Sequence, residues 1–341
     1  MARSKTRTVT LGLEAALALC TDAASAAGAS EMVAASIARS VVAAEADGQP
    51  TVGLAHFIDY LEALEAGRID GQAVPVMTRP ALALFQCDAR GGAAQPGFDL
   101  AFDDFSRAAK LFGVAIFSQK NAYTCGALGY FAGRLAEAGL AAIAATNGPP
   151  LLAGSGSAGP VFCTNPLAFA APVADGPPLI IDQASSATAF VNIREAAKAG
   201  KPIPKGWAID AAGAPTTDAG EAVKGALLAF GGARGANIAL MVEVLAAGLS
   251  GANWSLDAPD FASGSKSPGA GLVVIAMAPS LLDPDFAIRM RMQLDRLHLD
   301  HGVHIPGRAK AAARETAARN GLTVPQAIHD RIAQAASRLQ A

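Results

Sequence analysis

Apolar residues recur at helical spacing through the first part of the chain. They follow a period of three to four residues in 11–27, 30–47 and 54–66, and each run stops at a glycine. A short strand followed by three amphipathic helices is therefore predicted. Residues 86–99 are rich in Gly, Ala and Pro and are expected to form a loop, with a helix over 102–112 after it.

The pattern changes to interleaved strands and helices in the middle of the chain. Buried strands are predicted from the short apolar runs 113–117, 140–145, 169–172, 179–182 and 271–277. Helices are predicted between them, over 128–138 and 237–249. Strands that alternate with helices in this way indicate an α/β layer.

The tail from 308 to 338 returns to a helical pattern with charges on one face. The chain is therefore expected to have a helical part, 1–112 together with 291–341, packed around an α/β part, 113–290. The fold class that the pattern predicts is α/β, with helices in the N- and C-terminal parts.

Composition and charge exclude several classes of function. The 341 residues are 52% hydrophobic and 16% charged, with a formal net charge of −2. These values describe a globular protein, with no nucleic-acid or membrane partner expected. Cys20, Cys87, Cys125 and Cys163 lie far apart, without disulfide or zinc spacing, so reduced thiols and a cytoplasmic location are expected.

The N-terminus resembles a secretory signal, because Arg3, Lys5 and Arg7 precede an apolar run at 11–20. Glu14 interrupts that run, and an amphipathic helix explains the segment better. No apolar stretch approaches the roughly 20 uncharged residues that a membrane span requires.

Two glycine-rich segments are candidates for phosphate binding. Residues 154–159 spell a literal G-x-G-x-x-G, but Pro160 and a strand-like run follow, whereas the dinucleotide fingerprint requires a helix. A flexible loop is predicted there. Residues 231–237 do lead into a helix, and their backbone N–H groups together with Arg234 could bind an anion. An ordinary glycine-rich turn is the alternative.

Two polar clusters and one histidine adjoin apolar runs. Thr164 and Asn165 precede Pro166, where either a turn or a hydroxyl offered to a ligand carboxylate is expected. Residues 182–186 follow a predicted strand, as ligand sites in α/β sheets do, although a simple helix cap fits equally well. His56 lies on an otherwise apolar helix, either as a packed residue or as a catalyst. No histidine pair stands beside a carboxylate with metal spacing, so no metal is assigned.

An ordered series of short motifs runs through most of the chain. The motifs are 60–61, 66–69, 125–130, 139–140, 146–147, 164–166, 182–186, 204–210, 215–218, 231–235 and 305–307. With these motifs in this order, the sequence resembles the malate/L-lactate dehydrogenase family that is not of Rossmann type. The resemblance implies a homodimer with a mixed-sheet α/β core, in which the α/β part binds the cofactor and the helical part contributes to dimerisation.

The nicotinamide site of that family lies outside the usual dinucleotide fold, so the resemblance assigns the cofactor to several separate segments. The residues concerned are Thr124, Cys125, Gly126, Ala127, Leu128, Asp182, Gln183, Ala184, Ala233, Arg234, His304, Ile305, Pro306, Gly307, Arg308, Ala309 and Lys310. Arg234, Arg308 and Lys310 could bind a 2′-phosphate, so NADPH is expected, with NADH as the alternative.

The departures from the family pattern concern proton transfer. The family has Ser-His-Gly-x-x-Arg at the start of the third helix, with the His as proton donor and the Arg on the substrate carboxylate. The corresponding stretch here is 51–56, which puts Val52 at the donor position and His56 at the arginine position. Asn192 replaces the aspartate that completes the relay, so Ser-His-Asp has become Thr51-Val52-Asn192.

Loss of the relay favours a substrate that needs little acid catalysis. A positioned acid or base contributes about 10²–10⁴-fold, and valine cannot supply it, whereas a cyclic imine nitrogen can enter already protonated. We therefore predict reduction of Δ1-pyrroline-2-carboxylate or Δ1-piperideine-2-carboxylate to L-proline or L-pipecolate. The predicted catalytic positions are Thr51, His56 and Asn192, and the predicted substrate contacts are Val52, His56, Thr164, Phe190 and Val191.

Two other functions stay open. One is a 2-hydroxy-acid dehydrogenase that has rebuilt its acid around His56, and the other is a non-catalytic nucleotide-binding relative. His56 itself has two candidate roles, as a substitute proton donor or as a partner of the substrate carboxylate. The expected partner of either enzyme is a small imino or oxo acid.

Overall fold

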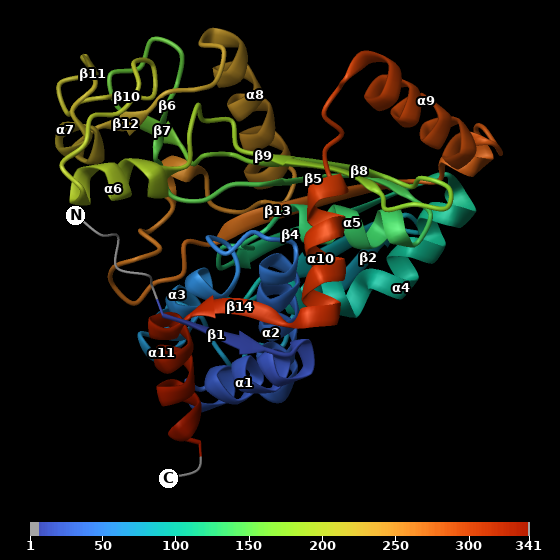
Figure 1. Ribbon diagram of the computed structural model, residues 1–341, viewed down its shortest axis with the longest axis horizontal. Helices are drawn as coiled ribbons and strands as arrows, with labels where there is room; N and C mark the ends of the chain where they lie inside the picture. Colours follow the sequence, from blue (N-terminus) through green and yellow to red (C-terminus); the bar gives the residue numbers. More distant parts are fainter. Residues whose placement is uncertain (1–6, 340–341) are drawn as a thin grey trace.

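A seven-stranded mixed sheet organises the computed structural model, which describes residues 7–339 (Figure 1). Its strands, in spatial order, are β2 (Val76–Ala81), β3 (Leu84–Asp88), β4 (Val114–Ala122), β13 (Ala270–Met277), β5 (Ala141–Thr146), β8 (Leu167–Ala171) and β9 (Leu179–Gln183). β3 and β4 are parallel, and the other neighbouring pairs are antiparallel. The predicted mixed-sheet α/β class is confirmed.

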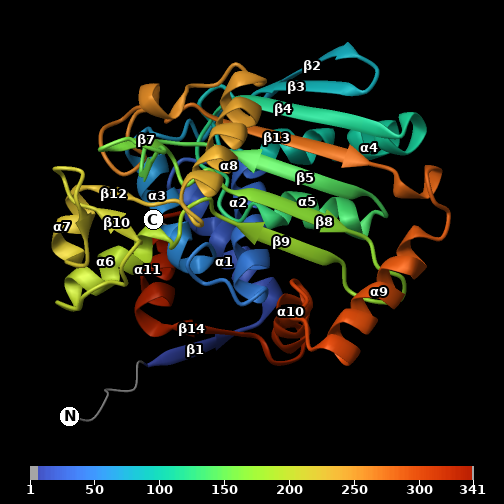
Figure 2. The ribbon, with the colours of Figure 1, turned by 90° about the horizontal axis from the view of Figure 1, so that it is seen from above.

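Helices cover both faces of this sheet (Figure 2). They are α4 (Gln95–Phe112) and α5 (Gly129–Glu137) on one face, and α8 (Ala233–Glu243) with the π-helical turn η1 (Val244–Gly248) on the other. Under α4 and α5, the ring of Phe98 stacks edge-to-face on Phe117 and Phe131, with centroids 5.5 and 5.1 Å away. Because strands covered on both faces must be apolar throughout, they appear in the sequence as unbroken apolar runs.

The N-terminal helices form a second layer together with the C-terminal segments. Its elements are α1 (Leu13–Ala26), α2 (Glu31–Ala46), α3 (Leu54–Glu65), α10 (Arg308–Asn320), α11 (Gln326–Ser337) and a ribbon of β1 (Thr8–Leu11) with β14 (Leu322–Pro325). The predicted association of the two terminal parts is confirmed, since Leu11 pairs with Leu322. The predicted amphipathic helix at 11–27 is also confirmed, because α1 buries Ala16, Cys20 and Ala23.

A smaller five-stranded sheet projects beside α8. Its strands, in spatial order, are β11 (Pro215–Thr216), β10 (Ala208–Ile209), β12 (Ala226–Leu227), β6 (Leu152–Ala153) and β7 (Pro160–Phe162), and α6 (Phe190–Lys198) and α7 (Ala219–Lys224) pack on it. Leu152, Ile193 and Leu227 form its own apolar core. The small sheet thus holds α6 on the same side of the molecule as α8.

Helix α9 (Phe286–His301) stands apart from these layers (Figure 1). Leu294 is its one buried side chain, whereas Met292 and Leu299 are 67% and 76% exposed. The helix ends at Gly302, whose left-handed φ of 66° a glycine adopts without strain. An apolar face is thus left open along α9.

Three sequence predictions are corrected by the structure. The loop expected at 86–99 is wrong at both ends, because β3 extends to Asp88 and α4 begins at Gln95 rather than 102. Proline fits the first turn of a helix, and Gly97 is needed there since a Cβ would lie 2.1 Å from Oε1 of Gln119. The helical tail is interrupted by β14, and the helix predicted from 237 starts at Ala233.

The boundary between the two parts of the chain stays a prediction. Residues 76–112, assigned by pattern to the helical part, contribute β2, β3 and α4 to the central sheet and its covering layer.

Arg3 and Lys5 of the signal-like segment lie outside the described residues. Within 7–339, no helix is both long and apolar enough to cross a membrane.

Candidate active site

Three predicted site segments and the motif 146–147 meet at one edge of the central sheet. β4, β5 and β9 run in the same direction, and β8 runs against them. The chain therefore leaves β4, β5 and β9 beside the point where it enters β8. The segments at this edge are 124–128, 146–147, 164–166 and 182–186. Their common position follows from strand direction alone.

The turn 124–128 is fixed by two buried side chains beneath it. Tyr60 of α3 donates a hydrogen bond to the Thr124 carbonyl at 2.8 Å, and Gln95 of α4 donates to the Tyr60 hydroxyl at 3.1 Å and to the Cys125 carbonyl at 3.2 Å. Burial raises the pKa of the Cys125 thiol to about 12. The buried hydroxyl oxygen of Thr124 has no hydrogen-bond partner among residues 7–339.

Asp182 ties the end of β9 to the start of α5. Its carboxylate accepts a hydrogen bond from the Gly129 backbone N–H at 2.7 Å. Burial raises the pKa of this carboxyl, and the Gly129 N–H and the charge of Lys310 oppose the rise. The predicted cofactor segments 124–128, 182–184 and 304–310 therefore lie together. The buried Leu128 and Ala127 lie just before α5, while Gln183, after Asp182, is exposed and Ala184 half-buried.

The segment 304–310 reaches the same region by crossing β9. A Cβ on Gly307 would lie 2.9 Å from the Ile180 nitrogen, so only glycine lets the backbones approach this closely. Gly307 also has a left-handed φ of 94°. Arg308 is engaged with Asp295 at 2.6 Å. Of the other segment residues, Ile305 is buried, Pro306 and Lys310 are half-buried, and His304 and Ala309 are exposed.

A buried carboxylate organises the segment before β8. Glu243 of α8 accepts hydrogen bonds from the Asn165 amide at 2.7 Å and from the Ser255 hydroxyl at 2.8 Å. Asn165 also accepts at its carbonyl from the Ser185 hydroxyl at 2.8 Å, while Ser185 N–H donates to the Thr164 carbonyl at 2.8 Å. Thr164 is thus held between β9 and α8 with its side chain half-buried.

The two glycine-rich loops line one cavity of about 440 Å³. Residues 154–157 form one wall, and 228–233 with Ala236 form the other. The strand β7 follows the G-x-G-x-x-G, so the prediction that this motif lacks its helix is confirmed. The second loop does start a helix, with Gly231 and Gly232 at φ of 60° and 65° and with Ala233 and Arg234 exposed at its first turn. Backbone hydrogen bonds between 185–187 and 228–230 join this loop to the sheet edge.

The positions of the altered relay lie on two separate elements. Thr51 and Val52 form the turn before α3, with Thr51 exposed and Val52 half-buried. Asn192 lies on the first turn of α6, where its amide donates to the Thr188 hydroxyl at 2.9 Å. No hydrogen bond joins Asn192 to Thr51 among residues 7–339. Within the described chain, Thr51, Val52 and Asn192 therefore do not form a hydrogen-bonded proton relay.

Phe190 and Val191 differ in how they are placed on α6. Phe190 is half-buried and packs against the core of the small sheet, whereas Val191 is 36% exposed. Both side chains precede Asn192 directly on the first turn of the helix.

The start of α3 also carries His56, which approaches the turn 124–128. Its Nδ1 lies 2.8 Å from Oδ2 of Asp59, and its ring packs edge-on against Tyr60 with centroids 5.0 Å apart. Its Cδ2 would be 3.9 Å from a Cβ placed on Gly126. The structure therefore brings His56 to the predicted cofactor turn, while Asp59 was not singled out from the sequence.

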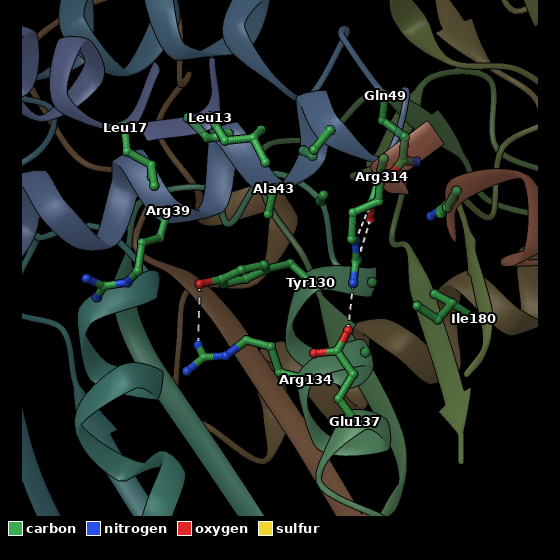
Figure 3. Close-up of a pocket in the computed structure, with 18 residues that line it drawn as sticks. Leu13, Leu17, Arg39, Ala43, Gln49, Tyr130, Arg134, Glu137, Ile180 and Arg314 are labelled. Atoms are coloured by element: carbon green, nitrogen blue, oxygen red, sulfur yellow. Dashed lines mark hydrogen bonds and ion pairs between the residues drawn. The ribbon is translucent and has the colours of Figure 1, made fainter. Parts of the chain in front are cut away.

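Sequence reasoning also missed a cavity of about 300 Å³ that adjoins the sheet edge (Figure 3). Ala127, Gly129 and Lys310 line it on the side of the predicted cofactor segments, and apolar side chains of α1 and α2 line it opposite. Arg314 projects into it from α10, paired with Glu137 at 2.7 Å and with Asp47 at 2.8 Å. Its walls come from five elements distant in sequence, so no local motif could reveal it.

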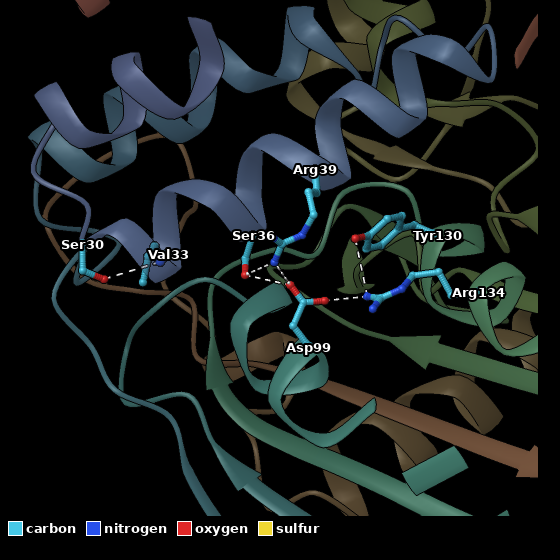
Figure 4. A network of polar contacts seen from close by, with 7 residues as sticks. All are labelled: Ser30, Val33, Ser36, Arg39, Asp99, Tyr130 and Arg134. Carbon is cyan, nitrogen blue, oxygen red and sulfur yellow. Dashed lines mark hydrogen bonds and ion pairs between the residues drawn. The ribbon is translucent and has the colours of Figure 1, made fainter. Parts of the chain in front are cut away.

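Arginines from α2 and α5 meet at the end of this cavity (Figure 4). Both Arg39 and Arg134 pair with Asp99 of α4, and the Ser36 hydroxyl donates to the same carboxylate at 2.7 Å. Arg134 lies 4.4 Å from the centroid of the Phe102 ring. The cluster joins three helices and carries one positive charge in excess.

Within residues 7–339, no group of His, Cys, Asp and Glu side chains is arranged to hold a metal ion.

Comparison with known proteins finds dehydrogenases and reductases of one family. The family model described as Malate/L-lactate dehydrogenase matches residues 12–333. A Δ1-pyrroline-2-carboxylate/Δ1-piperideine-2-carboxylate reductase of Pseudomonas aeruginosa is 36% identical over 297 residues, which are 86% of this chain and 89% of that protein. A (2R)-3-sulfolactate dehydrogenase (NADP⁺) of Chromohalobacter salexigens is 33% identical over 89% of this chain and 91% of its own.

A solved structure resembles the whole molecule. The crystal structure of Δ1-piperideine-2-carboxylate reductase from Pseudomonas syringae superposes with a TM-score of 0.92 at 32% sequence identity. The match covers 96% of this chain and 100% of that one. The fold of this chain is therefore shared, over nearly its whole length, with a known reductase.

Proposed function

This chain belongs to the malate/L-lactate dehydrogenase family and is an NAD(P)-dependent oxidoreductase, and we propose that it reduces a cyclic 2-imino acid. The substrate is Δ1-pyrroline-2-carboxylate or Δ1-piperideine-2-carboxylate, and the product is L-proline or L-pipecolate. The relatives named as reductases of these compounds support this choice over a hydroxy acid.

The observation that carries the proposal is the absence of the proton relay from positions 51, 52 and 192. Val52 offers no proton, and the Asn192 amide is committed to Thr188. A carbonyl substrate requires a proton at the oxygen as the hydride arrives, and a positioned acid contributes about 10²–10⁴-fold. An iminium carbon accepts hydride while its nitrogen already carries the proton, so the loss affects this reaction least.

The cofactor supplies the hydride when bound, and the protein supplies the surroundings. We assign cofactor binding to 124–128, 182–184, 233–234 and 304–310. The unpartnered Thr124 hydroxyl and the glycine loop at the start of α8 fit a polar, phosphate-bearing group. Thr164 is assigned to the substrate carboxylate, and Val52, Phe190 and Val191 to the apolar ring of the substrate. His56 is assigned to proton delivery.

We propose NADPH rather than NADH as the preferred cofactor. Arg308 is paired with Asp295, whereas Lys310 forms no ion pair with any residue of 7–339 and lines the cavity beside α5. Arg234 is exposed at the start of α8. Of the three cations predicted to bind a 2′-phosphate, Lys310 and Arg234 therefore remain available.

We further propose a cytoplasmic homodimer. The open apolar face of α9, with Met292 and Leu299, is of the kind that a second copy covers. All four cysteines are free, which agrees with a reducing compartment. Light scattering of the native protein and of Met292→Glu tests the dimer, which the variant should dissociate.

The decisive experiment is a substrate panel. Initial rates are measured with NADPH and with NADH against pyrroline-2-carboxylate, piperideine-2-carboxylate, pyruvate and oxaloacetate. We expect the cyclic imines to give the highest kcat/KM. Turnover of the oxo acids alone would refute the proposal in favour of a hydroxy-acid dehydrogenase. NADPH binding by fluorescence without turnover of any compound would favour a non-catalytic relative.

A further inference from the structure

We propose that Asp59 is a positioning residue that acts through His56, so that the pair replaces the proton-handling relay missing from this chain. The inference rests on the proposed imine reduction. It adds a residue that neither the sequence pattern nor the relay positions indicate. The pair lies on the first two turns of α3, directly after the turn that holds Val52.

The geometry orients the imidazole ring toward the site. Nδ1 of His56 lies 2.8 Å from Oδ2 of Asp59, three residues further along the helix. The opposite edge of the ring, at Cδ2, faces the turn at Gly126. With Nδ1–H donating to the carboxylate, Nε2 is the nitrogen left for a ligand. No residue of 7–339 forms a hydrogen bond with Nε2.

The helix that carries the pair is rigidly anchored. Glu45 of α2 accepts a hydrogen bond from the Leu54 N–H at 2.8 Å, which caps the start of α3. Gly53 is needed for this contact, since a Cβ would lie 2.4 Å from Oε2 of Glu45. Tyr60, one turn after His56, is fixed by the Thr124 carbonyl and by Gln95. The His56 side chain is 19% exposed, so it retains access to solvent and ligand.

Asp59 is the acidic group in direct contact with the ring. A hydrogen bond from Nδ1–H to its carboxylate is charge-assisted, and it fixes the tautomer and the orientation of the ring.

Other titratable groups lie on the neighbouring elements. Tyr60 packs against the ring with centroids 5.0 Å apart, and Glu45 of α2 accepts from the first N–H of α3. Tyr123 has Arg68 and Asp260 beyond it, and Cys125 has Asp182 at the sheet edge. Burial raises the pKa of Tyr123 and that of Cys125 each to about 12, so both are uncharged near neutral pH. Arg68 and Asp260 carry opposite charges. Asp59 is therefore the charged group that contacts the His56 ring directly.

The proton balance of the step is simple. Hydride from the reduced nicotinamide forms a C–H bond at the imine carbon, and the C=N π pair moves to nitrogen. Nε2–H of the His56 imidazolium gives its proton to that nitrogen and leaves a neutral imidazole hydrogen-bonded to Asp59. Water then reprotonates the ring. The pair thus extends turnover to pH values at which the free imine is unprotonated.

The test compares pH profiles of kcat/KM for pyrroline-2-carboxylate at saturating NADPH. The native enzyme, Asp59→Asn and His56→Gln are assayed, with Glu65→Gln as a matched loss of charge at the far end of α3. We expect Asp59→Asn to move the alkaline limb about one pH unit lower. We expect His56→Gln to lose roughly 10²-fold on the alkaline side. The Glu65→Gln profile should match the native one, because titration of the substrate is common to all four.

Overlapping profiles of the native enzyme and Asp59→Asn would overturn the inference. Failure of the native enzyme to reduce any cyclic imine would instead refute the proposed function. In that case an NMR titration of the His56 imidazole, assigned by its loss in His56→Gln, decides whether Asp59→Asn lowers its pKa. An unchanged imidazole titration would likewise overturn the pairing.

Discussion

The two sides of the candidate site are built differently. On the side assigned to the cofactor, each segment is held by a buried side chain of another element. These side chains are Tyr60, Gln95, Asp182 and Glu243. On the proton side, Thr51, Val52 and Asn192 lie on an exposed turn and a short helix without a hydrogen bond among them in the described chain. His56 and Asp59 form a polar pair there, and the Asn192 amide is bonded to Thr188 of its own segment.

The contrast shows which part of such a site can change during divergence. Segments that hold a cofactor through backbone groups depend on strand direction and close packing, and any shift disturbs several of them at once. A proton donor is a single side chain. Its role can pass to a residue one helical turn away if that residue reaches the same cavity. The substrate then changes with the proton chemistry, while the fold and the cofactor are retained.

The largest effect is expected from breaking the cofactor side at Glu243. Glu243→Ala leaves the Asn165 amide and the Ser255 hydroxyl without their buried acceptor, which should cost about 3 kcal/mol of unfolding free energy. Urea denaturation measures this loss. Glu221→Ala is the control, because it removes an exposed ion pair with Lys224 and should cost under about 0.5 kcal/mol. Equal losses in the two variants would contradict the assigned network.

Restoring the family relay sharpens the comparison from the other side. The double variant Val52→His and Asn192→Asp should raise kcat/KM for pyruvate or oxaloacetate about 10²-fold, because a charged pair again delivers the proton. Steady-state rates with NADPH measure the gain. Each single variant is a control and should gain far less, since the two side chains act together. No gain in the double variant would mean that these positions do not face the substrate.

The contrast also explains what the sequence could reveal. Unbroken apolar runs located β4, β5 and β13, because strands covered on both faces must be apolar throughout. The hairpin of β2 and β3 was not found, since its exposed residues such as Arg79 and Gln86 interrupt any apolar run. The helix start at Gln95 was hidden because Pro96 and Gly97 are also typical of loops.

Within the site, motifs predicted the segments but not their partners. The residues at 124–128 and 182–184 are ordered along the chain, and strand direction brings them together in space. The His56–Asp59 spacing of three residues was visible in the sequence, although nothing local indicated that the ring would face Gly126. The cavity beside α5 is lined by Arg39, Arg134 and Arg314, which helix packing brings to it from three helices.

A smaller effect is expected from Lys310 and separates the two cofactors. Lys310→Gln should weaken NADPH binding about 10-fold, equivalent to about 1.4 kcal/mol, and leave NADH nearly unchanged, because only NADPH carries a 2′-phosphate. Fluorescence titration measures both dissociation constants. Lys224→Gln, at an exposed lysine paired with Glu221, is the control. An equal loss for both cofactors would place Lys310 away from the 2′-phosphate.

The smallest effect is expected for the cysteine of the cofactor turn. Cys125 is 3% exposed and burial raises its pKa to about 12, so about 10⁻⁴ of it is thiolate at pH 8. Iodoacetamide should therefore leave Cys125 unmodified in the native protein over an hour, as read by mass spectrometry. Val52→Cys, on the proton side, should be labelled readily under the same conditions, and urea should expose every thiol. Rapid labelling of Cys125 would show that the sheet edge opens as freely as the turn before α3, and the distinction between a fixed cofactor side and a changeable proton side would fail.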